Sequence, residues 1–100
     1  MKEWTYKEWQ EAMKKERVAA FYLYTPMCGT CAVASKMMAV MEELLPDVAI
    51  GKGNVNYLEN LAMEYEVESV PCLLIARDGE YAQKLYAFQS VPNLYEILKK

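Results

Sequence analysis

Apolar residues change along the chain from helical spacing to continuous runs, and these changes predict the first elements. The segment TYKE at residues 5–8 has the form of a capping box, with Trp4 and Trp9 in the two positions of a hydrophobic staple. We therefore expect a surface helix over residues 6–17, where the last four residues are charged. The segment 18–24 is apolar throughout, which predicts a strand buried on both faces.

A longer helical pattern follows over residues 28–45 and ends before Pro46. The alternating segment 48–55 predicts a second strand, and Asn56 is expected to cap a short helix after it. We expect the buried faces of these two helices to include apolar residues at helical spacing, namely Val33, Met37, Met38, Met41, Leu44, Leu58, Leu61, Ala62, Met63 and Tyr65.

The C-terminal part predicts a β-hairpin and a helix. Asp78-Gly79 is a hairpin-turn signal between the strand-like segments 72–77 and 80–87, so these two strands should be antiparallel neighbours. Ser90 is expected to begin a final helix, whose inward residues are Leu94, Ile97 and Leu98. The predicted order is helix, strand, helix, strand, helix, strand, strand, helix.

Length and charge limit the classes of function. A chain of 100 residues suffices for one domain with one core, so we expect a single domain over residues 1–100. No apolar run approaches the roughly 20 residues that cross a bilayer, and residues 1–10 lack the apolar block of a secretory signal. We therefore expect a cytoplasmic protein without a membrane partner. The net charge of −3, without a Lys/Arg cluster, gives no electrostatic basis for nucleic-acid binding.

Two of the three cysteines, Cys28 and Cys31, lie where the apolar run meets the longest helix. A helix N-terminus offers unpaired backbone N–H groups and a positive dipole end, which favours the thiolate form of the first cysteine. Three alternatives remain open on the residues alone: a redox-active dithiol, an inert structural pair, and a metal site with Cys72. The chain has no histidine, so it offers at most three of the usual four zinc ligands.

The pattern resembles the thioredoxin family. The resemblance rests on Cys28-Gly29-Thr30-Cys31 at a strand-to-helix junction, on Tyr65-x-Val67-x-x-Val70-Pro71 about forty residues later, and on the apolar strand and hairpin that follow. It covers nearly the whole chain. It implies an α/β thioredoxin fold, with a central mixed sheet of four main strands, a short extra N-terminal strand around Trp4, and four flanking helices.

The resemblance also implies the chemistry. It makes the chain a thiol–disulfide oxidoreductase that acts on protein disulfides through a mixed-disulfide intermediate, with Cys28 as the nucleophile and Cys31 as the resolving thiol. Pro71 should be cis and should face this pair. No bound cofactor is expected, and a recycling reductase or a small-molecule thiol should reduce the pair again. The competing hypothesis is a redox-silent binding module.

Four positions depart from the family pattern, and a fifth, beside one of them, retains the family residue. Met27 replaces a tryptophan before the dithiol, Thr30 replaces a proline within it, and Ala87 replaces a glycine opposite it. Tyr22 replaces the buried acid that assists proton transfer in the family, whereas its lysine neighbour is retained as Lys52. Tyr22 and Lys52 are therefore the candidates for proton transfer.

A partner-binding groove is expected beside the cysteines. Met27, Val70 and Pro71 are its candidate substrate-binding residues, together with Pro26. Cys72 follows Pro71 directly and is expected to be a buried packing thiol, because free cysteine is among the most buried residue types.

Overall fold

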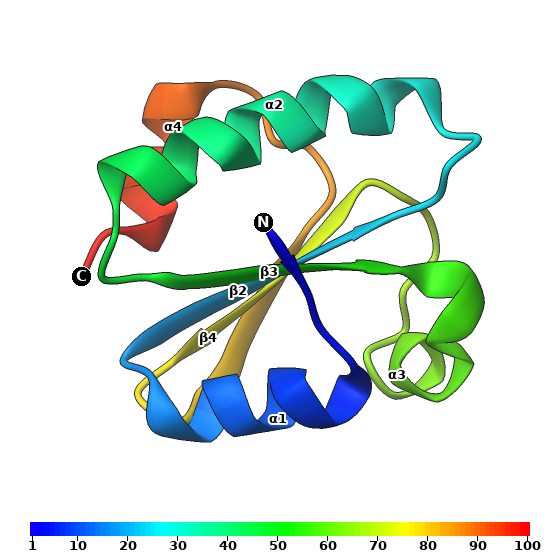
Figure 1. Cartoon of the computed structure of the whole chain (residues 1–100), viewed down its shortest axis with the longest axis horizontal. Coiled ribbons are helices and arrows are strands. Elements are labelled where there is room, and N and C mark those ends of the chain that lie inside the picture. The colour runs from blue at the N-terminus through cyan, green and yellow to red at the C-terminus, as the bar shows by residue number, and fades with distance from the viewer.

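The computed structural model describes residues 1–100 and places a five-stranded sheet between two layers of helices (Figure 1). The strand order is β1-β3-β2-β4-β5. The strands β1, β3 and β2 are parallel, whereas β4 is antiparallel to both of its neighbours, so the sheet is mixed. The strands are β1 (Lys2–Glu3), β2 (Val18–Tyr24), β3 (Ala49–Asn54), β4 (Cys72–Arg77) and β5 (Glu80–Leu85). The prediction of four main strands and a short N-terminal strand is confirmed.

Four α-helices cover the two faces of the sheet. The helices α2 (Gly29–Leu44) and α4 (Val91–Leu98) lie on one face, and α1 (Tyr6–Lys15) and α3 (Glu59–Glu64) lie on the other (Figure 1). A short 3₁₀ helix, η1 (Val55–Tyr57), precedes α3. No helix is both long enough and apolar enough to cross a bilayer.

The central strand β2 divides the core into two parts because successive side chains point to opposite faces of a sheet. Val18, Ala20 and Tyr22 pack with residues of α2 and α4, whereas Phe21 packs with residues of α1 and α3. Residues 18–23 are all buried, which confirms the predicted two-sided strand. Tyr22 therefore points toward the helix that begins at the cysteine pair.

Local signals form the predicted ends of two elements. Thr5 Oγ1 accepts a hydrogen bond from the Glu8 N–H at 3.1 Å, and the Glu8 carboxylate accepts one from the Thr5 N–H at 2.9 Å, so the capping box is present. At the hairpin, Asp78 and Gly79 have φ values of 54° and 88°. Two positive φ values in succession are typical of a type I′ turn, which matches the twist of the strands that it joins.

The buried face of α2 differs from the prediction. The buried residues are Cys31, Ala34, Met38 and Met41. Val33 is 60% exposed and Leu44 is 50% exposed, so their assignment to the core is wrong. The helix carries apolar residues around most of its circumference, and periodicity alone therefore does not identify the buried stripe.

The start of α3 also differs from the prediction. Asn54, rather than Asn56, caps a helical segment, because its side chain accepts a hydrogen bond from the Asn56 N–H at 2.9 Å and begins η1. The α3 helix itself begins at Glu59 without a side-chain cap. Within α3 only Leu61 is buried, and Met63 is 77% exposed, so its assignment to the core is wrong.

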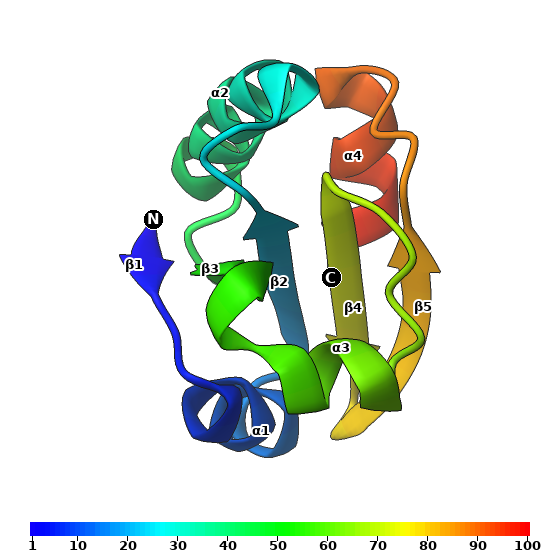
Figure 2. The same ribbon diagram turned by 90° about the vertical axis from the view of Figure 1, so that its right-hand side faces the viewer.

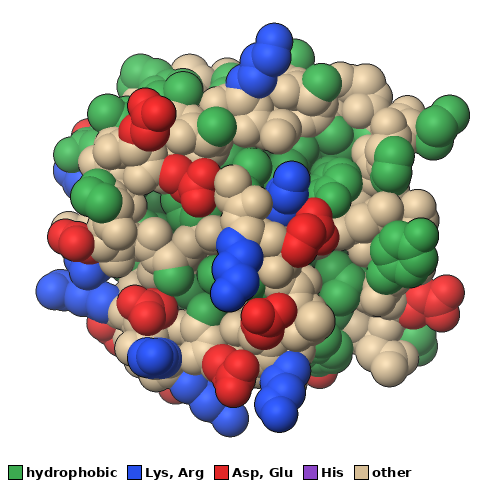
Figure 3. Space-filling model, in the orientation of Figure 1, with side chains coloured by type: hydrophobic (Ala, Val, Ile, Leu, Met, Phe, Trp, Pro, Cys, Tyr) green, Lys and Arg blue, Asp and Glu red, His purple; other side chains and the backbone are tan.

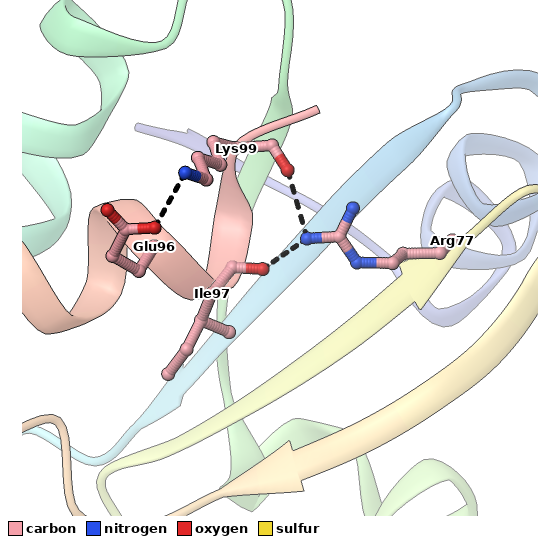
Figure 4. A network of polar contacts seen from close by, with 4 residues as sticks. All are labelled: Arg77, Glu96, Ile97 and Lys99. Carbon is pink, nitrogen blue, oxygen red and sulfur yellow. Dashed lines mark hydrogen bonds and ion pairs between the residues drawn. The ribbon is translucent and has the colours of Figure 1, made fainter.

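A polar network joins the end of β4 to the last helix (Figure 4). The Arg77 guanidinium donates hydrogen bonds to the carbonyl oxygens of Ile97 and Lys99, the second at 3.0 Å. The Lys99 ammonium forms an ion pair with Glu96 at 2.7 Å. Carbonyl groups at the end of a helix lack partners within it, so Arg77 satisfies them and holds α4 against the sheet.

Candidate active site

The cysteine pair lies where β2 delivers the chain to the N-terminus of α2. Cys28 is the N-cap residue of α2, and it forms a disulfide with Cys31 one turn into the helix, with 5.3 Å between the two Cα atoms. Cys28 is partly exposed, whereas Cys31 is only 4% exposed. The first sulfur is therefore accessible to another molecule, and the second is shielded by its own helix.

Polar groups surround the Cys28 sulfur. The Cys31 N–H donates a hydrogen bond to Cys28 Sγ at 3.2 Å, and the Thr30 hydroxyl lies 3.4 Å from the same atom. A disulfide sulfur carries no proton, so Thr30 is the donor in this contact. Both groups are placed to stabilise a negative charge on Cys28 in the reduced protein, because hydrogen bonds to an ionised acceptor are the stronger ones.

The Val70–Pro71 peptide lies beside the pair. This peptide bond is cis, and the Val70 carbonyl oxygen is 3.7 Å from Cys28 Sγ. The contact joins residues 42 positions apart in the sequence and brings the start of β4 to the end of β2. The candidate residues Cys28, Cys31, Val70 and Pro71 therefore lie together at one end of the sheet, which faces the viewer in Figure 2.

Tyr22 and Lys52 are neighbours across the β2–β3 pair. Both line a cavity of about 190 Å³ beside Cys28 and Cys31. The Tyr22 hydroxyl donates a hydrogen bond to the Cys31 carbonyl oxygen at 2.6 Å, and burial raises the pKa of Tyr22 to about 12. The Lys52 ammonium lies 5.9 Å from the centroid of the Tyr24 ring. No carboxylate lines this cavity, so Lys52 is its one charged side chain at neutral pH.

Met27 stands apart from the other candidates. Its side chain is 94% exposed and extends into solvent from the loop before the pair. It lines neither the cavity beside Tyr22 nor the groove on the far side of Pro71. The structure thus places Met27 next to Cys28 in the chain but outside the hollows around it.

The groove beyond Pro71 contains residues that the sequence did not single out. It has a volume of about 420 Å³, and its lining residues are Thr30, Val33, Ala34, Met37, Pro71, Tyr86, Phe88 and Gln89. Val33 is exposed because it lines this groove. Tyr86 and Phe88 alternate directly after β5, and that aromatic spacing is the signal that could have identified them.

Cys72 is separated from the pair. It is fully buried, and it packs with Trp9, Phe21 and Leu61 on the face of the sheet that α1 and α3 cover. Burial raises the pKa of its thiol to about 12. The three cysteines do not converge, and no three His, Cys, Asp or Glu side chains are arranged to hold a metal ion. The expected packing role for Cys72 agrees with this placement.

Comparison with known proteins decides the family. The family model described as "Thioredoxin" matches residues 1–100. The chain belongs to the thioredoxin family. It is 50% identical over 86 residues to the thioredoxin-like protein YusE of Bacillus subtilis (strain 168), which covers 86% of this chain and 81% of that protein. It is 39% identical over 79 residues to the thioredoxin of Staphylococcus saprophyticus, which covers 73% of this chain and 71% of that protein.

Solved structures of the thioredoxin family show the same fold. A mutant thioredoxin from Halobacterium salinarum superposes with a TM-score of 0.88 at 23% identity, over 99% of this chain and 87% of that one. Oxidised mitochondrial thioredoxin 3 from Saccharomyces cerevisiae superposes with a TM-score of 0.87 at 23% identity, over 99% of this chain and 93% of that one. The thioredoxin fold is therefore confirmed.

Family and geometry together give the general chemistry. A thioredoxin-family chain whose two CxxC cysteines form a disulfide at a helix N-terminus is a thiol–disulfide oxidoreductase. The two alternatives are not favoured. A redox-silent module does not account for a partly exposed Cys28 that forms a disulfide with Cys31 at a helix N-terminus. A metal site would require Cys72 as a third ligand, and its side chain is buried on the other face of the sheet.

Proposed function

We propose that this protein reduces disulfide bonds of protein substrates through Cys28 and Cys31. The observation that carries the proposal is the unequal exposure of the two sulfurs at the start of α2. The Cys28 thiolate attacks one sulfur of the substrate disulfide, and the other sulfur leaves as a thiolate that takes up a proton. The Cys31 thiolate then attacks Cys28 Sγ, which releases the reduced substrate and leaves the Cys28–Cys31 disulfide.

The substrate segment is proposed to lie along Val70 and Pro71. The Val70 carbonyl is 3.7 Å from Cys28 Sγ, so a chain that presents a sulfur to Cys28 must pass beside it. Pro71 forms part of the groove on one side of this proposed path of the substrate chain. Met27 offers an exposed apolar side chain on the loop before Cys28. Met27, Val70 and Pro71 are therefore our candidates for substrate binding.

Proton transfer from Cys31 is assigned to the cavity beside Lys52. Tyr22 is a neutral phenol at neutral pH, because burial raises its pKa to about 12, and its proton is already donated to the Cys31 carbonyl. It therefore orients the first turn of α2 rather than accepting a proton. Lys52 remains the candidate that assists the transfer, because it is the one charged side chain that lines the cavity. Its ammonium has no site for a further proton, so it stabilises the negative charge on Cys31 while solvent takes up the proton.

The cycle needs a source of electrons and no resident cofactor. The disulfide left after each turnover must be reduced by a recycling reductase or by a small-molecule thiol. We place the activity in the cytoplasm, where thiols are kept reduced and the direction of exchange is toward substrate reduction. The net charge of −3 favours neither a nucleic-acid partner nor an anionic membrane surface.

Reduction of insulin by dithiothreitol tests the proposal. The wild-type protein should accelerate precipitation of the insulin B chain well beyond dithiothreitol alone. Cys28→Ser should abolish the acceleration, whereas Cys72→Ala should retain it, because Cys72 is buried away from the pair. If the wild-type rate equals that of dithiothreitol alone, the chain is a redox-silent module and the proposal is wrong.

A further inference from the structure

A third hollow lies on the side of α3 and extends to Val70, and we call it the α3 pocket. It has a volume of about 430 Å³ and lies between α3 and the loop that leads to β4, both in the foreground of Figure 2. Its lining residues are Val55, Glu59, Ala62, Met63, Val67, Glu68, Ser69 and Val70. The proposed mechanism assigns no role to the residues of α3 and of the loop that line this pocket.

The α3 pocket combines an apolar floor with charge of one sign. Met63 is 77% exposed although it is apolar, so part of the floor is open to solvent. The charged residues of the lining are Glu59 and Glu68, and both are exposed. Neither forms an ion pair, because the salt bridges of the structure join the N-terminus to Glu42 and Lys99 to Glu96. In Figure 3 the right-hand margin, where α3 lies, shows hydrophobic and acidic side chains without Lys or Arg.

Val70 connects the α3 pocket to the reacting sulfur. It lines the pocket, and its carbonyl oxygen is 3.7 Å from Cys28 Sγ. An extended chain advances about 3.3 Å per residue. A substrate whose cysteine sulfur reaches Cys28 therefore places side chains two or three positions away within reach of the pocket.

The loop that carries Glu68 is held in place by β5 and the residue after it. The Lys84 ammonium donates hydrogen bonds to the carbonyl oxygens of Tyr65 at 2.9 Å and Glu66 at 2.8 Å. The Tyr86 hydroxyl accepts a hydrogen bond from the Glu68 N–H at 3.0 Å. Lys84 is thus bound to backbone carbonyls and pairs with no carboxylate. The backbone of Glu68 is fixed before a substrate arrives, which lowers the cost of ordering on binding.

We propose that the α3 pocket selects protein substrates in which an apolar side chain and a Lys or Arg lie within about three residues of the attacked cysteine. This proposal rests on the proposed function and names its substrate class. The apolar side chain covers the floor at Met63 and Val67, and the cation pairs with Glu59 and Glu68. Exposed charges of this kind act mainly on the rate of association, and salt screens them.

Matched peptides test the selection. Each peptide carries one cysteine as a mixed disulfide with thionitrobenzoate, a neighbouring Leu, and two further residues that are both Lys, both Gln or both Glu. Release of thionitrobenzoate by the reduced protein gives a second-order rate constant. At low salt the Lys peptide should react about three to ten times faster than the Glu peptide, and high salt should remove the difference.

Charge-matched variants separate the α3 pocket from the overall charge. Glu59→Gln combined with Glu68→Gln should reduce the preference for the Lys peptide to less than about twofold. Glu11→Gln combined with Glu43→Gln changes the net charge equally, on exposed positions of α1 and α2, and should keep the preference. Replacing Leu by Gly in the Lys peptide should slow the reaction, and Met63→Gln should weaken that dependence on Leu.

Three outcomes would overturn the selection: equal rates for the Lys and Glu peptides, an equal loss of preference in both double variants, or no effect of replacing Leu. A small aromatic disulfide without a peptide reports the dithiol separately. If wild-type protein reduces this compound but shows no peptide preference, only the selection is wrong. If it reduces neither the compound nor any peptide, the proposed function itself is wrong.

Discussion

The hydroxyl of Tyr22 donates a hydrogen bond to the carbonyl oxygen of Cys31 over 2.6 Å. This bond joins the central strand β2 to the first turn of the helix that carries the dithiol. Tyr22 is 1% exposed, and burial raises its pKa to about 12, so the phenol remains protonated throughout the neutral range. In this position a neutral donor fixes the geometry of the pair but cannot accept the Cys31 proton.

Tyr22→Asp should therefore accelerate disulfide reduction, because a carboxylate at this position can accept the proton of Cys31. The same change should lower the free energy of unfolding by about 1–3 kcal/mol, since it buries a polar group among apolar neighbours. Steady-state insulin reduction and denaturant unfolding measure the two effects. Tyr22→Phe is the matched control: it removes only the hydrogen bond, costs about 0.5–1.5 kcal/mol, and should not reproduce the acceleration. A folded Asp variant that is no faster than wild type would mean that water already takes this proton.

The sequence predicted the elements whose signals are local. The capping box at Thr5 and Glu8 and the turn at Asp78-Gly79 depend on residues that touch one another within a few positions, so the sequence contains the whole interaction. The strand β2 could be predicted as buried because every residue in it is apolar. The thioredoxin resemblance then supplied the arrangement of the sheet, which no local pattern specifies.

The misassigned features depend on tertiary contacts. Val33 is apolar and at helical spacing, yet it lines a groove formed with segments near residues 71 and 86–89. Met63 is exposed although it is apolar, because it lies toward the open pocket beside α3, whereas Leu61 is the residue of this helix that the core buries. The role of Lys84 likewise could not be predicted, since it depends on carbonyl groups at Tyr65 and Glu66, 18 to 19 positions away. Periodicity describes a single element and does not identify which neighbours cover it.

Thr30→Val should make the Cys28–Cys31 pair more reducing. The Thr30 hydroxyl lies 3.4 Å from Cys28 Sγ and stabilises the reduced, negatively charged sulfur more than the disulfide. Loss of about 1–1.4 kcal/mol of this stabilisation corresponds to a fall in reduction potential of about 20–30 mV. Equilibration with a glutathione buffer measures the potential. Thr30→Ser keeps the hydroxyl and should keep the wild-type value; a similar fall in both variants would show that the hydroxyl has no part in it.

The buried thiol of Cys72 should make stability depend on alkaline pH. Its pKa is raised to about 12 in the folded protein, whereas an unfolded thiol ionises near pH 8.5. Below about pH 8 the thiol is protonated in both the folded and the unfolded state, so its contribution to the free energy of unfolding is present in full. Above pH 8.5 the unfolded state loses its proton first, so the free energy of unfolding falls by about 2 kcal/mol by pH 10.

Denaturant unfolding of the oxidised protein between pH 7 and pH 10 checks this expectation, with Cys72→Ala as the comparison. Other groups titrate alike in both proteins, so the difference between the two pH profiles isolates Cys72. The Ala variant should be less stable at pH 7 by about 1 kcal/mol and should lose less stability on going to pH 10. Parallel profiles would show that the Cys72 thiol ionises as easily in the folded protein as in the unfolded one.

The order in which the two thiols act should be visible as a trapped intermediate. In Cys31→Ser the resolving thiol is absent, so a protein substrate should accumulate as a mixed disulfide on Cys28. In Cys28→Ser no adduct should accumulate, because Cys31 is only 4% exposed and cannot reach a bulky disulfide. Non-reducing electrophoresis detects the adducts, and mass spectrometry of the tryptic peptides assigns the sulfur.

Cys72 provides the decisive control for this trap. It follows Pro71 in the sequence, and a thiol so close to the pair could resolve the intermediate in place of Cys31. The structure places its side chain in the α1 and α3 core, with no exposed surface, so the adduct on Cys28 should be equally stable with and without Cys72→Ala. If the adduct decays faster when Cys72 is present, the strand β4 opens during turnover and Cys72 acts as a third redox sulfur. If adducts form on Cys31 when all three thiols are available, the assignment of Cys28 as the nucleophile is wrong.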